Sequence, residues 1–137
     1  MKTLLFVKYL LILILFSGTA CEEVIVDQKL RVGSEFIFQI NKAYTSEDGN
    51  FTLKITDIGD SRCPEGVVCI WQGEVTVKGE WTENNSKSTF ELHSVQTDQQ
   101  KQPEGYTIKL VDAKPYPKYG ADSKPEDLLV TLLIQKN

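Results

Sequence analysis

Apolar and polar residues alternate along most of the chain beyond its N-terminal segment, and this alternation predicts β-strands. In the clearest case, segment 51–58, Phe51, Leu53 and Ile55 point one way while the residues between them point the other. A period of two is the pattern of a strand that buries one face. Similar alternation or short apolar runs predict further strands at 29–32, 35–40, 74–81, 89–93, 105–112 and 128–134.

Turn-forming residues separate these segments, for example at 45–50 and 84–86. Pro115 and Pro117 exclude their segment from a sheet interior, because proline donates no ladder hydrogen bond. About seven strands with turns between them and no helical period predict an antiparallel, Ig-like β-sandwich, with a small closed barrel as the alternative. Segment 128–134 has leucines on both faces, so we expect it to be covered on both.

The N-terminus has the plan of a secretory signal peptide. Lys2 and Lys8 supply positive charge, an apolar stretch follows, and small residues occupy positions 17–20. A membrane-spanning helix is the alternative, but the uninterrupted apolar run at 9–16 is far shorter than the ~20 residues that cross a bilayer. We therefore expect residues 1–20 to be a signal peptide.

The residues before Cys21 resemble a bacterial lipobox, with small Gly18 and Ala20 close to the cysteine. An ordinary signal peptide with one spare cysteine is the alternative. The resemblance implies a lipid on Cys21. Residues 21–28 are too few and too acidic to pack on their own and are expected to be a tether, and the alternating segments place the β-sandwich domain at 29–137. The resemblance further implies an extracytoplasmic, lipid-anchored protein of a bacterial membrane, by expectation the outer one, with the periplasmic or surface side open.

Composition narrows the classes of partner. Removing residues 1–20 takes two lysines from a chain of formal charge −4, which leaves 117 residues and −6. That is the length of one domain. An acidic domain without a basic cluster argues against nucleic acid and against electrostatic docking on anionic lipid.

Cys63 and Cys69 are six positions apart, with Pro64 and Gly66 between them. In an exported chain this spacing favours a structural disulfide, which stabilises a small loop by ~2 kcal/mol. A metal site would need more ligands than lone His93 offers, and a redox pair is normally Cys-x-x-Cys. Both remain alternatives.

Trp71 and Gly73 follow the second cysteine of the pair. We expect Trp71 to pack over the disulfide, in preference to serving as a stacking platform for a ligand. We expect Gly73 to let a neighbouring backbone approach or to form a bulge.

Polar and aromatic residues near this loop form a possible interaction surface. We expect the segment from Asp60 to Arg62 to be a surface turn in which Arg62 pairs with a neighbouring acid. Tyr116 and Tyr119 could present aromatic rings to a glycan or to a protein partner, or could belong to a rigid connection. The candidate contact surface therefore consists of Asp60, Arg62, Trp71, Tyr116 and Tyr119.

The sequence offers little for catalysis. A hydrolase hypothesis would need a pocket that gathers His93 with Asp57 or Asp60, and general acid–base work needs a desolvated carboxyl group there. A calcium loop would need more carboxylates than 57–61 contains. We therefore expect no catalytic residues, no cofactor and no metal, and a protein that is not an enzyme.

Residues 60–73 follow the pattern D-S-R-C-P-x-x-V-x-C-x-W-x-G. In this the chain resembles a family of small uncharacterised bacterial, Bacteroidetes-like lipoproteins and secreted proteins, and the strand at 105–110 with the prolines behind it is similar to the family's later segment. The resemblance implies an exported all-β domain and carries over no catalytic or ligand residues. The sequence thus predicts a non-catalytic binding or structural module of the cell envelope. An enzyme inhibitor or sensor that presents loop 60–73 is the alternative.

Overall fold

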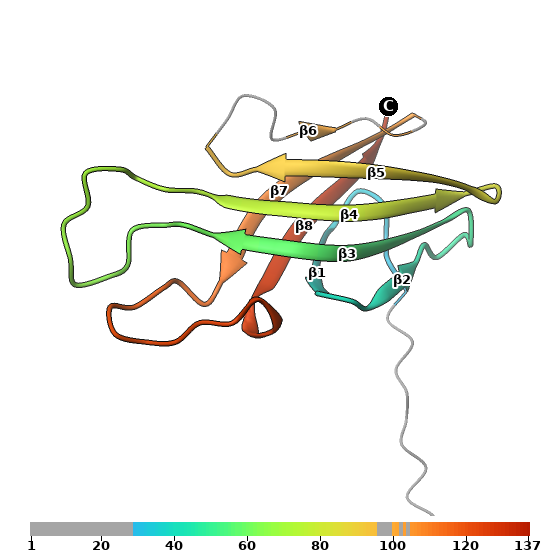
Figure 1. Ribbon diagram of the computed structural model, residues 1–137. Coiled ribbons are helices and arrows are strands. Elements are labelled where there is room, and N and C mark those ends of the chain that lie inside the picture. The colour runs from blue at the N-terminus through green and yellow to red at the C-terminus, as the bar shows by residue number, and fades with distance from the viewer. Residues whose placement is uncertain (1–28, 96–99, 102, 104) are drawn as a thin grey trace, which may run out of the picture.

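The structure is a computed structural model that describes residues 29–95, 100, 101, 103 and 105–137 (Figure 1). The signal peptide, Cys21 and the tether at 21–28 lie outside the described residues. The strands are β1 (Glu35–Gln39), β2 (Ala43–Thr45), β3 (Phe51–Asp60), β4 (Val75–Glu83), β5 (Ser86–His93), β6 (Gln100–Lys101), β7 (Tyr106–Lys114) and β8 (Leu129–Lys136). One 3₁₀ turn, η1 (Pro125–Asp127), precedes β8.

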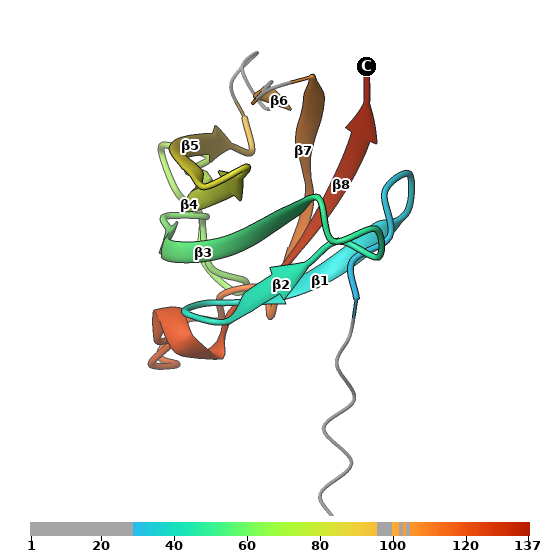
Figure 2. The same ribbon diagram turned by 90° about the vertical axis from the view of Figure 1, so that its right-hand side faces the viewer.

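The strands form two four-stranded sheets, in the orders β1-β8-β7-β6 and β2-β3-β4-β5. Every neighbouring pair is antiparallel. The two sheets lie opposite each other in Figure 2, with β3, β4 and β5 facing β7 and β8. The prediction of an antiparallel β-sandwich is confirmed, and the two sheets are separate rather than closed into one barrel.

The apolar residues of the alternating strands meet between the sheets. Phe51, Leu53 and Ile55 of β3 are buried, as their spacing predicts. Trp81 stacks on Phe51 with ring centroids 3.9 Å apart, and Tyr106 of the opposite sheet lies 5.1 Å from Trp81. Aromatic contacts of this kind add to the stability that burial alone supplies.

Two β-bulges interrupt the period of two. The register of β3 against β4 shifts between Ile55 and Asp57, which brings Ile58 rather than Asp57 to the buried face. In β7 a shift between Leu110 and Asp112 likewise brings Ala113 rather than Asp112 to the buried face. Each bulge lets a strand continue into the core after one residue is left unpaired.

Two expectations about individual strands are wrong. Segment 29–32 is not a strand, because the chain turns at Gly33 and only Leu30 forms a bridge, to Ser46. The last strand is not covered on both faces, since Leu129 is 38% exposed while Val130 and Leu132 are buried. Edge strand β2 and short β6 were not predicted.

The fold places the cysteine loop at the end of the sandwich opposite the point where the chain enters it. Leu30 contacts Thr45 and Ser46, next to the start of β3, through its backbone. The cysteine loop leaves from the other end of β3, at Asp60 (Figure 1). A ten-residue strand is roughly 30 Å long, so the two ends are well separated.

Candidate functional site: the stapled loop

Residues 61–74, here named the stapled loop, connect β3 to β4. A disulfide joins Cys63 to Cys69 with 5.8 Å between their Cα atoms, which confirms the predicted bridge. At the base of the loop the Ser61 N–H donates to the carbonyl of Glu74 at 2.8 Å, and the Cys63 N–H donates to that of Gln72 at 3.1 Å. The loop therefore leaves the sheet as a paired ribbon and is closed near its tip by a covalent bond.

Gly73 makes this base possible. Its φ is +68°, a left-handed conformation that glycine adopts at little cost. A Cβ atom there would collide with the backbone carbonyl of Ser61 on the opposite side of the ribbon. The close backbone approach expected at Gly73 is therefore confirmed.

A second segment supports the loop from the side. Residues 115–120, here named the proline segment, follow β7 and run past Glu65. The Glu65 N–H donates to the carbonyl of Pro117 at 2.9 Å, and the Tyr119 N–H donates to that of Glu65 at 3.2 Å. This bridge ties the stapled loop to the sheet that does not contain β3.

Asp60 and Arg62 form a largely buried ion pair at the base of the loop, and not the surface turn expected from the sequence. The side chains are only 5% and 12% exposed, and Arg62 donates from Nη2 to Asp60 Oδ2 at 2.6 Å and from Nε to Oδ1 at 2.8 Å. Hydrogen bonding to Asp60, and its negative charge, raise the pKa of Arg62 against the opposing effect of burial. The expected pairing of Arg62 with a neighbouring acid is confirmed.

The same guanidinium fastens the loop to the end of β7. Arg62 donates from Nη1 to the carbonyl of Ala113 at 2.8 Å and from Nη2 to that of Pro115 at 3.0 Å. Its Cζ also lies 4.6 Å from the ring centroid of Tyr116. Asp60 and Arg62 are thus engaged in holding the two sheets together and are not available as a contact surface.

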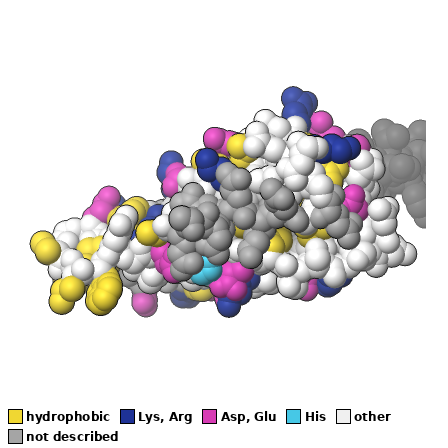
Figure 3. All heavy atoms as spheres, turned by 90° about the horizontal axis from the view of Figure 1, so that it is seen from above, with side chains coloured by type: hydrophobic (Ala, Val, Ile, Leu, Met, Phe, Trp, Pro, Cys, Tyr) yellow, Lys and Arg dark blue, Asp and Glu magenta, His cyan; other side chains and the backbone are white. Residues whose placement is uncertain are grey.

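Trp71 does not pack over the disulfide. Its side chain is 82% exposed, so the expectation of a packed tryptophan is wrong. Val68 and Ile70 are almost fully exposed as well, and Tyr119 of the proline segment is 75% exposed. Figure 3 shows hydrophobic side chains gathered at the end of the molecule where the stapled loop lies.

Of the five residues predicted as a contact surface, the structure therefore exposes Trp71 and Tyr119 and half-exposes Tyr116 beside Arg62, whereas Asp60 and Arg62 are largely covered. It adds Val68 and Ile70, which the sequence reasoning missed. Their position in the sequence could have pointed to them. Val68 and Ile70 flank Cys69 in a predicted disulfide loop, and no predicted strand there would turn them toward a core.

The structure does not bring the residues of the hydrolase hypothesis into one pocket. His93 on β5 lies between two glutamates, with Nδ1 3.4 Å from Glu74 Oε1 and Nε2 3.3 Å from Glu91 Oε1. Its Nδ1 is buried without a hydrogen bond to the described residues. Asp57 and Asp60 lie on β3, and strand β4 separates β3 from β5, which carries His93. Two strand spacings, together about 10 Å, therefore separate the strand of His93 from the strand of these carboxylates.

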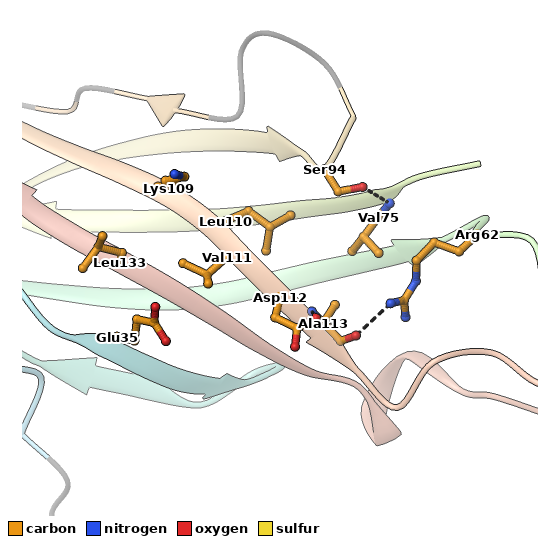
Figure 4. A pocket seen from close by; sticks show the side chains of 10 residues that line it. All are labelled: Glu35, Arg62, Val75, Ser94, Lys109, Leu110, Val111, Asp112, Ala113 and Leu133. Atoms are coloured by element: carbon orange, nitrogen blue, oxygen red, sulfur yellow. Dashed lines mark hydrogen bonds between the residues drawn. The ribbon is translucent and has the colours of Figure 1, made fainter. Parts of the chain in front are cut away.

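A hollow of about 340 Å³ lies at the bulge of β7, and Figure 4 shows its lining. Arg62 is at one end, with its guanidinium turned toward the Ala113 carbonyl, and Glu35, Lys109 and Asp112 supply charges of both signs. None of the residues of the hydrolase hypothesis lines it. Across the described ranges no group of three or more His, Cys, Asp or Glu side chains is placed to hold a metal ion.

Comparison with known proteins adds no relative: no protein-family model, curated protein or solved structure matches this chain. Among the described residues no helix is long and apolar enough to span a membrane.

Proposed function

We propose that this protein is a lipid-anchored module of the bacterial cell envelope that binds a partner through the tip of its stapled loop and performs no catalysis. The observation that carries the proposal is the exposure of Val68, Ile70 and Trp71 on a loop that is fixed at its base, by its disulfide and by the proline segment.

Exposure of three neighbouring large apolar side chains calls for an explanation. Burying one such side chain is worth ~1.5–3 kcal/mol, and clustered exposed apolar residues mark contact surfaces. Tryptophan is also the residue type most enriched among those that dominate binding energy. Because the loop is already ordered, little conformational entropy remains to be lost on binding.

The position of the loop suits presentation away from the membrane. A lipid on Cys21 would be joined to the domain by the tether at 21–28, which spans at most about 28 Å when fully extended. The chain enters the sandwich beside Leu30, and the loop begins roughly 30 Å away at the far end of β3. An anchored domain would therefore hold Val68, Ile70 and Trp71 out toward the compartment it faces.

The charge pattern indicates the kind of surface that the tip fits. Residues 67–72 carry no charged side chain, although the chain as a whole is acidic. Glu65 and Glu74 flank this run in the sequence, and Asp60 and Arg62 neutralise each other at the base of the loop. The partner should therefore offer an apolar recess rather than a charged face.

Site-specific photo-crosslinking tests the proposal. A benzophenone amino acid at Ile70, in the full chain expressed in its native cells, should give one reproducible protein adduct on illumination. The matched control is the same amino acid at Ile37 of β1, which is 55% exposed on the outer sheet face.

Equal adducts from both positions, or lipid adducts only from Ile70, would contradict the proposal. The first result would mean that the loop has no preference for a partner, and the second that the tip contacts the bilayer.

A further inference from the structure

The outer face of the sheet that contains β1, β8 and β7 carries an acid, a leucine and a base in one row. Glu35 of β1 pairs with Leu133 of β8, and Leu133 pairs in turn with Lys109 of β7. Directly paired residues of neighbouring strands point to the same side of a sheet, so these three side chains form a line across it. Figure 4 shows Glu35 and Lys109 on either side of Leu133. Among the described residues, no ion pair involves Glu35 or Lys109.

Apolar side chains lie on the same face beside this row. Ile37 is 55% exposed and Leu129 is 38% exposed, and each is an even number of positions from a member of the row on its own strand. Such residues share one side of a strand. Val111, at the bulge of β7, is 41% exposed and lines the hollow together with Leu133. Clustered apolar side chains on a surface mark a place where another molecule binds.

The charges of this face are complementary to the same face of a second copy. The acid, Glu35, is on β1, and the bases, Lys109 and Lys114, are on β7 at the opposite margin. Two copies stacked face to face about a twofold axis parallel to β8 would place β1 of each copy against β7 of the other. Each Glu35 would then lie opposite Lys109 of the second copy. Stacked sheets are about 10 Å apart, a gap that glutamate and lysine side chains can bridge together.

The pattern also discriminates between the two possible twofold axes. An axis perpendicular to β8 in the plane of the contact would place β7 against β7, with Lys109 opposite Lys114 of the second copy. Like charges that face each other oppose association. The axis parallel to β8 avoids this contact. It also brings Ile37 against Val111 of the second copy, because these residues follow Glu35 and Lys109 by two positions.

We infer that the outer face of β1, β8 and β7 binds a second copy of this chain about a twofold axis parallel to β8. The contact goes beyond the proposed function, since the stapled loop leaves from the other sheet and takes no part in it. The face is three strands wide and β1 has five residues, so it offers less than the ~800 Å² per partner of a standard stable interface. The pair is therefore weak in solution. Confinement of lipid-anchored copies to one membrane would raise their effective concentration.

Photo-crosslinking from Ile37 tests the inference in the full chain, expressed in its native cells. A benzophenone amino acid at Ile37 should give on illumination an adduct of two copies of this chain. Mass spectrometry identifies it, because both crosslinked peptides then belong to the same sequence. This adduct differs in composition from the adduct with another protein that is expected from Ile70, so Ile37 still serves as the control for the loop.

Charge exchange tests the axis. Glu35→Lys should lower the yield of the two-copy adduct about tenfold, because it places lysine opposite Lys109, and Lys109→Glu should lower it to a similar extent. The chain that carries both changes should regain the yield of the unaltered chain, since the two charges are merely interchanged. The matched control is Glu91→Lys, which makes the same change of charge on β5 of the other sheet and should leave the yield unaltered.

The inference is overturned if Ile37 gives no adduct, or gives adducts only with lipid or with another protein. It is also overturned if the chain with both charge changes forms no more two-copy adduct than either single variant. A two-copy adduct at Ile37 without a protein adduct at Ile70 would support this contact and contradict the proposed function. The reverse result would leave the proposed function and remove the contact between copies.

Discussion

The two tryptophans of this protein lie in opposite environments. Trp81 is 1% exposed and stacks on Phe51 between the sheets, whereas Trp71 is 82% exposed on the stapled loop. The body of the domain is held by apolar packing. The loop is held by a disulfide, a largely buried ion pair and backbone hydrogen bonds. Its exposed apolar side chains therefore contribute little to the stability of the fold.

This difference separates what maintains the fold from what the fold presents. A residue whose side chain touches the core cannot be changed without loss of stability. A residue at the tip of the stapled loop can be changed freely as far as folding is concerned, and is therefore free to serve binding. The predictions below test this separation, beginning with the largest expected effect.

Trp81→Ala should destabilise the domain by ~3–5 kcal/mol, since it removes the largest buried side chain and leaves a cavity beside Phe51 and Tyr106. Trp71→Ala should change the free energy of unfolding by less than ~0.5 kcal/mol. Urea denaturation of both variants and of the unaltered chain measures these two changes in the free energy of unfolding. Similar losses for the two would contradict the division between body and loop.

Arg62→Ala should cost about 3 kcal/mol, because it leaves Asp60 buried without its partner and frees two carbonyl acceptors at the end of β7. The matched control is Arg31→Ala. Arg31 pairs with Glu47 at 3.2 Å on the surface, where such pairs contribute ~1 kcal/mol or less. A cost for Arg62→Ala no larger than the control would mean that the ion pair does not fasten the loop.

Replacing both Cys63 and Cys69 with alanine should lower the free energy of unfolding by ~2 kcal/mol, through the greater entropy of the unfolded chain. The core should keep its structure, so near-ultraviolet circular dichroism from buried Trp81 should persist. Collapse of that signal under native conditions would show that the disulfide supports the body as well as the loop.

The turn around Asp48, at the other end of β3, contains no disulfide. We expect its contribution to the stability of the fold to depend weakly on pH. Asp48 accepts hydrogen bonds from Ser46 Oγ at 2.6 Å and from the Asn50 backbone at 3.1 Å, and these bonds lower the pKa of Asp48. A carboxyl group with a lowered folded-state pKa stabilises the fold above its unfolded pKa of about 3.9 and loses that contribution as pH falls through the folded value.

Thermal unfolding of Asp48→Asn beside the unaltered chain checks this sign. The unaltered chain should be the more stable at about pH 6, and the difference in Tm should shrink as the pH falls to about 2.5. A difference that grows toward low pH would contradict the assignment of the stabilising bonds to ionised Asp48.

The sequence predicted the body better than the loop. Alternation alone predicted that Phe51, Leu53 and Ile55 face the core, because a half-buried strand has no other way to hide them. The bulges after Ile55 and Leu110 were not predictable from it, since a one-residue register shift depends on the partner strand.

In the loop, cysteine spacing was enough to predict the disulfide, and Gly73 the close approach of backbone. The burial of Asp60 and Arg62 depends on carbonyls of Ala113 and Pro115, some 50 residues later in the chain, which no local pattern indicates. The prediction for Trp71 failed because it assumed that a tryptophan beside a disulfide covers it. The anchor at Cys21 stays a prediction.

One variant tests the central claim most directly: Ile70→Asp, measured both for stability and for partner binding. We expect the free energy of unfolding to stay within ~0.5 kcal/mol of the unaltered chain, because Ile70 contacts solvent. We expect the same variant to lose the protein adduct formed from a benzophenone at Trp71. Unchanged adduct formation, or a loss of more than ~2 kcal/mol in stability, would contradict the account.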